Sequence, residues 1–144
     1  MKTHLKIALL ASAFGAFAVQ AHDGASGAVK QRMDAMGEIR GGMKVLGSMA
    51  GGKLAFDAEA AKAAAAQIEA HSAMIPMLFK EQDTTAPSEA RETIWENFDD
   101  FTDMAEAMEK AAIAAQSVSD LDELRGAVRR LGKSCKDCHA DYRL

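Results

Sequence analysis

The sequence LDELRGAVRRLGKSCKDCHADY, residues 121–142, combines a helical pattern of apolar residues with a short motif of two cysteines and a histidine. Its apolar residues recur three and four positions apart, which is the spacing of one face of an α-helix. The residues on that face are Leu121, Leu124, Val128, Leu131, Cys135, Cys138 and Tyr142. Two cysteines therefore share the face that a helix here would turn toward a core.

The second feature is the run Cys135-Lys136-Asp137-Cys138-His139. The spacing Cys-x-x-Cys-His is the pattern that attaches haem c covalently. The two thiols can form thioethers with the two vinyl groups, and the histidine that follows can bind the iron as proximal ligand. We therefore expect one covalently attached haem c per chain, held by Cys135 and Cys138, with His139 as an axial ligand of the iron.

Three other uses of the two cysteines fit less well. A disulfide between positions three apart on one helix would close a very small loop and would crosslink no other element. A thioredoxin-like pair normally opens a helix after a strand, and this sequence has no strand pattern. A zinc ion needs about four ligands, and outside the N-terminal segment only His22, His71 and His139 could join the cysteines.

The N-terminus has the pattern of a secretory signal peptide. Lys2 and Lys6 form a basic start, residues 7–19 are almost wholly apolar, and Val19-Gln20-Ala21 is similar to a signal-peptidase site. About thirteen apolar residues are too few to cross a bilayer comfortably. We expect residues 1–21 to be removed as a signal peptide.

Residues 22–144 would then form one haem-binding domain, as the length of the chain indicates. Loss of Lys2 and Lys6 leaves 15 of the 17 basic residues against 21 acidic ones, a net charge of −6. Such a charge argues against nucleic acid and anionic membrane surfaces as partners, and it favours a basic partner or a small neutral ligand. No second apolar stretch follows that could span a membrane after the signal is cleaved.

The pattern of the mature chain is helical throughout, so we predict an all-α fold. The first helix is expected over about residues 26–50, and Gly51-Gly52 ends it because glycine accepts a left-handed conformation. Its apolar stripe consists of Val29, Met33, Met36, Ile39, Met43, Leu46 and Ala50. The second helix is expected to begin at Asp57, a good N-cap, and to stop before Pro76.

Residues 76–87 are predicted to form a connecting loop, after which Ser88 would cap a third helix. The stripe of that helix is Ile94, Phe98, Phe101, Ala105, Met108, Ala112 and Ala115. A weak capping box at residues 119–122 leads into the fourth helix. Four helices joined mostly by short links most simply form an antiparallel up-and-down four-helix bundle, with the covalently bound haem held against its interior.

With a haem motif near the C-terminus of a four-helix chain, the sequence resembles the class II c-type cytochromes, the group of cytochrome c′ and cytochrome c-556. The segments that carry the resemblance are Arg32-x-x-x-Met36, residues 43–47, Ile94-Trp95 and residues 132–143. The resemblance implies a periplasmic haem protein, often a homodimer, whose first helix supplies the distal side of the haem.

By the same resemblance, Met36 occupies the distal position. In the cytochrome c-556 type a methionine there binds the iron and gives a six-coordinate, low-spin centre suited to electron transfer. In many cytochromes c′ an apolar residue, which can itself be an unbound methionine, leaves the iron five-coordinate and open to NO or CO. A soft thioether stabilises ferrous iron, but methionine more often fills gaps in a core. Met36 is thus a candidate sixth ligand, and both alternatives stay open.

The resemblance also implies that Arg32, one turn before Met36, contacts a haem propionate. The alternative for Arg32 is a solvated charge. His71 lies near an apolar stripe and is a second, weaker candidate for an iron ligand, since histidines on such faces are usually packed or partly exposed. We expect Trp95 to pack in the core or at the haem edge.

These residues predict a carrier of single electrons between redox partners that the sequence does not identify, through cycling of Fe(III) and Fe(II). The alternative function is that of a five-coordinate cytochrome c′ that binds NO or CO. A peroxidase would need a distal base and a polar cradle, whereas the stripe around Met36 offers mainly methionine, alanine and glycine. Since no Ser-His-Asp or paired-carboxylate pattern is present either, we do not expect an enzyme.

Overall fold

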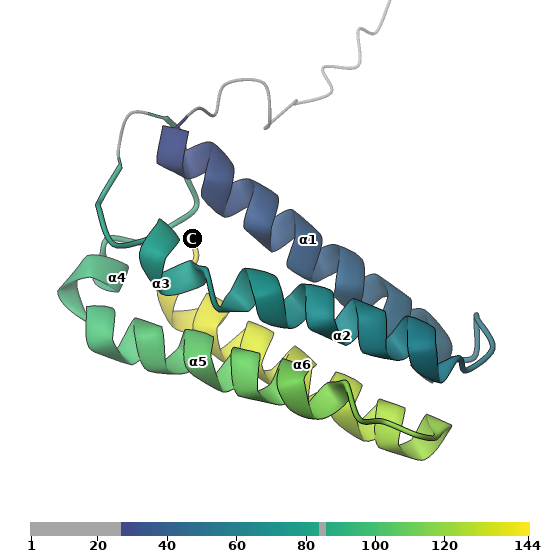
Figure 1. The fold of residues 1–144 in the computed structure, drawn as a ribbon. Helices are drawn as coiled ribbons and strands as arrows, with labels where there is room; N and C mark the ends of the chain where they lie inside the picture. Colours follow the sequence, from purple (N-terminus) through teal and green to yellow (C-terminus); the bar gives the residue numbers. More distant parts are fainter. Residues whose placement is uncertain (1–26, 84–85) are drawn as a thin grey trace, which may run out of the picture.

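The computed structural model describes residues 27–83 and 86–144 (Figure 1). The helices in this part of the chain are α1 (Gly27–Ala50), α2 (Ala58–Ser72), α3 (Ile75–Leu78), α4 (Thr93–Glu96), α5 (Phe98–Ala115) and α6 (Leu121–Tyr142). The predicted signal peptide, residues 1–21, lies outside the described residues. None of the described helices has the length and apolar character needed to cross a membrane.

The four long helices form an antiparallel up-and-down bundle (Figure 1). Helix α1 packs against α2, α2 against α5, α5 against α6, and α6 against α1, so the contacts close a ring around one core. The short helices α3 and α4 lie in the connection from α2 to α5, at the end of the bundle where α1 begins and α6 ends (Figure 1). The predicted fold class is confirmed.

The apolar stripes predicted for the last two long helices lie in or against this core. Helix α5 buries Phe101, Ala105, Met108, Ala112 and Ala115, all of them members of its predicted stripe. On α1 the buried face is rotated: the helix buries Val29, Arg32, Ala35, Ile39, Gly42, Leu46 and Met49. Met33, Met36 and Met43 are only half-buried. These methionines therefore border the core instead of filling its centre.

Helices α1 and α2 approach each other closely at Gly42. A Cβ atom at this position would lie 2.7 Å from Cγ1 of Ile68 and 2.8 Å from the carbonyl oxygen of Ala64. Because such contacts are far shorter than a van der Waals distance, only glycine fits here without a shift of α2. The many alanines of α2 allow the same close approach from the other side.

The link from α1 to α2 follows the sequence prediction. Gly52 has a φ of 73°, the left-handed conformation expected just past the end of a helix. Asp57 is the N-cap of α2, and its side chain accepts a hydrogen bond of 3.0 Å from the backbone N–H of Ala60. The glycine that ends α1 and the aspartate that caps α2 both act within one turn, as their residue types predict.

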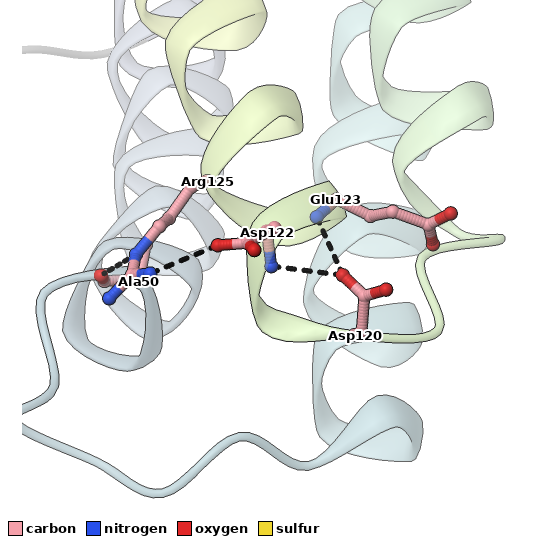
Figure 2. A network of polar contacts seen from close by, with 5 residues as sticks. All are labelled: Ala50, Asp120, Asp122, Glu123 and Arg125. Carbon is pink, nitrogen blue, oxygen red and sulfur yellow. Dashed lines mark hydrogen bonds and ion pairs between the residues drawn. The ribbon is translucent and has the colours of Figure 1, made fainter.

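The link from α5 to α6 is closed by a polar network (Figure 2). Asp120 caps α6, and its Oδ1 accepts hydrogen bonds of 2.9 Å from the backbone N–H groups of Asp122 and Glu123. The carboxylate of Glu123 returns to the backbone N–H of Ser119, at 2.8 Å. The predicted capping box over residues 119–122 is therefore wrong by one residue: Asp120 is the N-cap, and Glu123 bonds the N–H of Ser119, the residue before the cap.

Pro76 does not end the second helix, so that prediction is wrong. Helix α2 already ends at Ser72, and Pro76 lies in the first turn of α3. Proline is tolerated there because the N–H group that it lacks would have no partner within the helix. The backbone stays in the right-handed helical region through Ala73 and Met74, so the chain resumes a helical path after one turn.

The prediction that Ser88 caps a continuous third helix is also wrong. The hydroxyl of Ser88 accepts a hydrogen bond of 3.1 Å from the N–H of Ala90, but no helix starts there. Helix α4 is a single turn, and the backbone then breaks at Asn97, with a φ of −129° and a ψ of 46°. Ala90 instead forms an antiparallel bridge with Arg143 at the end of α6. A long-range contact has replaced a local helical one.

Candidate functional site

The Cys-x-x-Cys-His segment lies in the last turns of α6, which Asp120 caps at its other end. Cys135 and Cys138 are half-buried free thiols that pack against the hydrophobic core. Met36, from the neighbouring helix α1, packs against the same core. His139 is largely exposed. The structure thus brings the predicted attachment residues and the candidate sixth ligand to one core.

Burial raises the pKa of both thiols. Desolvation is the main cause at Cys135. At Cys138 desolvation, followed by the nearby Cys135, Asp141 and Asp100, raises the pKa to about 11. Redox-active and metal-binding cysteines have lowered pKa values because they act as thiolates. The raised pKa values of these thiols differ from those of a thioredoxin-like pair, whose attacking cysteine acts as a thiolate.

His139 is held toward its neutral form. Desolvation lowers the pKa of its imidazole, the positive charge of Arg143 acts in the same direction, and Glu89 opposes both. Nε of Arg143 donates a hydrogen bond of 2.7 Å to the carboxylate of Glu89, and the two side chains also form an ion pair. A neutral imidazole has the free lone pair that an iron ligand needs.

Residues before α4 and at its start hold the last turn of α6 in place. Nη1 of Arg91 donates to the carbonyl oxygens of Ala140 and Asp141, at 3.2 and 3.4 Å. The hydroxyl of Thr93 donates to the carbonyl of Asp141 at 3.2 Å, and the N–H of Arg91 donates to the carbonyl of Tyr142 at 3.0 Å. These donors satisfy carbonyl groups that the end of a helix leaves without intrahelical partners.

Tyr142 fastens the same end of α6 to the start of α5. Its hydroxyl donates a hydrogen bond of 2.6 Å to Oδ2 of Asp100, and its ring packs edge-on against Phe101 with centroids 5.3 Å apart. The hydrogen bond to Asp100, followed by desolvation and nearby negative charge, raises the pKa of Tyr142 to about 12.

Arg32 lies in a polar and aromatic cage at the beginning of α1. Its Nε donates to the carbonyl of Leu78 at 2.8 Å and its Nη2 to the carbonyl of Glu81 at 2.5 Å. Its guanidinium carbon lies 4.7 Å from the ring centroid of Phe79 and 5.6 Å from that of Trp95. The indole N–H of Trp95 donates to the carbonyl of Phe79 at 2.8 Å, which fixes the cage.

One nitrogen of the Arg32 guanidinium lacks a hydrogen-bond partner among the described residues. Arg32 is only 3% exposed, so the interpretation as a solvated charge is wrong. Nη1 is buried and has no hydrogen-bond partner among the described residues. Burial lowers the pKa of Arg32, and the charge of Asp83 opposes that shift. A buried cation with a free N–H group is a donor suited to a carboxylate.

Sequence reasoning missed most of the residues around this site. Glu89 and Arg91 received no specific role, because the periodic pattern placed both in a helix. One signal was available: Asn97, a good N-cap residue type, is followed within one turn by two aspartates, which together indicate a helix start. His71 lies in the last turn of α2, which packs mainly on α1 and α5.

Two surface hollows lie on the bundle, and Trp95 of the cage around Arg32 lines the second. One, of about 550 Å³, is lined by residues of α5, α6 and their connection, including Val118, Gly126 and Arg130. The other, of about 180 Å³, is lined by residues near α4, including Asp83 and Trp95. Neither of these two hollows is lined by the cysteines or by Met36.

Comparison with known proteins agrees with this geometry. The sequence model of the family described as cytochrome c′ matches residues 27–143. The chain belongs to the cytochrome c′ family. Among its curated relatives, cytochrome c-554 of Cereibacter sphaeroides is 40% identical over 94 residues, which cover 61% of each chain. Cytochrome c-556 of Agrobacterium tumefaciens is 37% identical over 91 residues, or 62% of this chain and 74% of the relative.

Solved cytochromes c′ have the same bundle. The structure from Shewanella frigidimarina superposes with a TM-score of 0.73 and is 31% identical, covering 81% of this chain and 93% of that one. A nitric oxide complex of a cytochrome c′ variant from Alcaligenes xylosoxidans superposes with a TM-score of 0.70 at 30% identity, again covering 81% and 93%.

Members of this family bind haem c covalently, and the two cysteines of this chain are consistent with attachment through Cys-x-x-Cys-His. Three observations show that the residues of this chain suit a covalently bound haem. Both thiols are free and pack against the core. The imidazole of His139 is biased toward its neutral form. A buried N–H group of Arg32 lacks an acceptor among the described residues.

Proposed function

We propose that this chain is a periplasmic carrier of single electrons, with haem c attached to Cys135 and Cys138 and the iron bound by His139 and Met36. The observation that carries the proposal is the packing of Met36 and both cysteines against one core from the adjacent helices α1 and α6. The names of the sequence relatives, cytochromes c-554 and c-556, support this type over a cytochrome c′ with open iron.

Haem c would supply the Fe(III)/Fe(II) couple, and the residues of the chain hold and tune it. Cys135 and Cys138 fix the position of the cofactor on α6, and His139 presents a neutral ring nitrogen. The hydrogen bonds from Arg91 and Thr93 keep the last turn of α6 rigid, which fixes the backbone that carries His139. Rigid ligands keep the geometry of a metal site similar in both redox states.

Met36 contributes a soft thioether, which stabilises ferrous iron and raises the reduction potential. Arg32, one turn earlier on α1, offers its unpartnered Nη1 to a propionate carboxylate. Such a charge-assisted bond would also offset part of the cost of burying the guanidinium. Within this proposal the chain transfers electrons and catalyses no reaction of its own.

The second candidate is a five-coordinate cytochrome c′ that binds NO or CO. One observation favours it: a solved relative with 30% identity and a TM-score of 0.70 is a nitric oxide complex. Met36 is half-buried at the border of the core, and a methionine in that position can crowd the iron without bonding to it. The two candidates differ in one bond, from the sulfur of Met36 to the iron.

The substitution Met36→Ala distinguishes the two candidates, and Met43→Ala is a matched control because Met43 also packs against the core from α1. As an electron carrier, the protein should change from a low-spin to a high-spin absorption spectrum with Met36→Ala, and its ferrous form should then bind CO. Met43→Ala should change neither property. If Met36→Ala leaves the resting spin state unaltered while CO affinity changes, the gas-binding alternative is correct.

The proposal includes export through residues 1–21 and action in the periplasm. N-terminal sequencing of the protein purified from the periplasmic fraction should begin at His22. A mature protein that retains Lys2 and Lys6 would contradict this part of the proposal.

A further inference from the structure

The charges of the two C-terminal helices are segregated. From Leu124 to Lys136, α6 has no acidic residue and five basic ones: Arg125, Arg129, Arg130, Lys133 and Lys136. The neighbouring α5 has one basic residue and five acidic ones: Asp99, Asp100, Asp103, Glu106 and Glu109. The negative net charge of the chain therefore conceals a positive local surface.

The positive surface lies on the side of α6 that faces away from the core. The helix buries Leu124, Ala127 and Leu131 on its inner side. Four exposed basic residues lie on its outer side, and together we call them the α6 basic face: Arg129, Arg130, Lys133 and Lys136. At 1.5 Å per residue, this face is about 10 Å long.

Most of the charge on the α6 basic face is not neutralised. Lys133 pairs with Asp137, but Arg129, Arg130 and Lys136 form no ion pair among the described residues. Nη1 of Arg130 and Nη2 of Arg129 lie 3.3 and 3.9 Å from the position that a Cβ at Gly126 would take. Two guanidinium groups thus gather over the same turn of the helix.

The acidic groups at the start of α6 already have partners. Oδ1 of Asp122 forms an ion pair of 3.1 Å with Arg125, as Figure 2 shows. The carboxylate of Glu123 accepts hydrogen bonds from the backbone and the hydroxyl of Ser119. Both carboxylates border the hollow that Arg130 lines, and neither forms an ion pair with Arg129, Arg130 or Lys136 among the described residues.

The α6 basic face and the haem-attachment segment share one helix. Lys136 lies between Cys135 and Cys138 in the sequence, and Lys133 lies two residues before Cys135. A helix with its side chains is about 10–12 Å across. A protein that docked on the outer side would therefore approach within about one helix diameter of the cysteine side chains on the inner side.

We infer that the α6 basic face is the docking surface for an acidic redox protein. The inference rests on the proposed electron-carrier function and specifies the charge of its partner. Opposite charges across an interface accelerate encounter and fix its orientation. A basic partner, which the net charge alone would favour, would be repelled at the surface nearest to Cys135 and Cys138.

A small acidic patch fits this surface better than an extended polyanion does. The basic face is about 10 Å long, and the acidic helix α5 packs beside α6. The Debye length at physiological ionic strength is about 8 Å, so a flat anionic membrane would also meet the charges of α5. Charge complementarity therefore favours a protein with a local cluster of acidic residues.

The test uses the matured haem protein and two small redox probes of opposite charge. The oxidation rate of the ferrous protein is measured by stopped flow with hexacyanoferrate(III), an anion, and with tris(phenanthroline)cobalt(III), a cation, over a series of salt concentrations. We expect the rate with the anion to fall about tenfold from low to physiological salt and the rate with the cation to rise, because local charge controls encounter.

The double variant Arg129→Glu with Lys136→Glu replaces two positive charges of the face with two negative ones. Its matched control, Lys62→Glu with Lys110→Glu, changes the net charge equally at exposed positions on α2 and α5. The first variant should lose about tenfold of the low-salt rate with the anion. The control should stay within about twofold of the unmodified protein.

Three outcomes would overturn the inference, and they differ from one another. If the anion rate rises with salt, or if both variants behave alike, net charge controls the encounter and the face has no role. If the holoprotein sediments with phosphatidylglycerol vesicles at physiological salt and the Arg129→Glu/Lys136→Glu variant does not, the face binds membranes. If neither probe oxidises the ferrous protein, the electron-carrier function itself fails.

Discussion

The two ends of the bundle are built in different ways. At the end where α1 leads to α2 and α5 leads to α6, local signals suffice: Gly52 in a left-handed conformation and the N-caps Asp57 and Asp120. At the other end, Arg32 bonds to carbonyl groups 46 and 49 residues away, and Tyr142 bonds to Asp100 across 42 residues.

This difference follows the location of the haem segment. Cys138 and His139 lie on the last turns of α6, at the end with the long-range contacts. A cofactor site needs ligands that do not move, and rigid positioning requires contacts from several elements. The opposite end only has to reverse the chain, so a few capping residues are enough.

At each end of the bundle one arginine donates hydrogen bonds to backbone carbonyls. Replacing these two arginines should give the largest difference in stability between the ends. Arg32→Met should lower the free energy of unfolding by about 3 kcal/mol, because it removes one buried and one partly buried charge-assisted hydrogen bond. Arg125→Met should cost about 0.5 kcal/mol or less, since Arg125 is exposed and its bond to Ala50 is replaceable by water. Denaturant unfolding measures both. Equal losses would show that the two ends are not built differently.

The next largest expected change in stability comes from two glycines of α1. Gly42→Ala should destabilise the protein by about 1–3 kcal/mol, because the added methyl group would collide with Ile68 and Ala64 of α2. Gly47→Ala on the same helix is the matched control, since a Cβ there meets nothing within 4 Å. It should stabilise the protein by up to about 1 kcal/mol through helix propensity. If Gly42→Ala proves neutral in denaturant unfolding, α1 and α2 are not in close contact there.

The smallest expected effect is the pH dependence of stability that comes from Tyr142, at the end of the bundle that carries Cys138 and His139. The chain has one tyrosine, so ¹³C-labelled tyrosine gives one ring signal whose midpoint is the pKa of Tyr142. We expect a midpoint near 12 instead of 10.0, and Asp100→Ala should return it toward the ordinary value, whereas Asp99→Ala should not. Because the folded pKa lies above the unfolded one, this group stabilises the fold fully below pH 10 and loses that effect between about 10 and 12. An unshifted midpoint would mean that the bond to Asp100 is absent.

The same contrast explains what the sequence alone could predict. Periodicity identified all four long helices, and the residue types at Gly52 and Asp57 identified the end of α1 and the start of α2, because those signals act within one turn. The boundaries at Pro76 and Ser88 were wrong because the chain there follows contacts with α1 and α6. Such contacts join residues about fifty positions apart, as between Arg91 and Asp141, and no local pattern encodes them.

The site was predictable where the spacing of residue types along the sequence indicates a particular chemistry. The run from Cys135 to His139 identified the cofactor type, and the family pattern drew attention to Arg32 and Met36. The cage of Phe79 and Trp95 around Arg32 could not be predicted, because its geometry depends on how the connection from α2 to α5 folds back. The rotation of the buried face of α1, which places the methionines at the border of the core, likewise depends on packing against its neighbours.

The most direct test of the account is the absorption spectrum of the full-length chain expressed with haem-maturation machinery. The spectrum of the ferrous protein is recorded with and without CO. We expect covalently bound haem c with sharp, split low-spin bands that CO does not change, because Met36 would already occupy the sixth position. A high-spin spectrum that shifts with CO would contradict the electron-carrier proposal, and a chain without covalent haem would contradict the site itself.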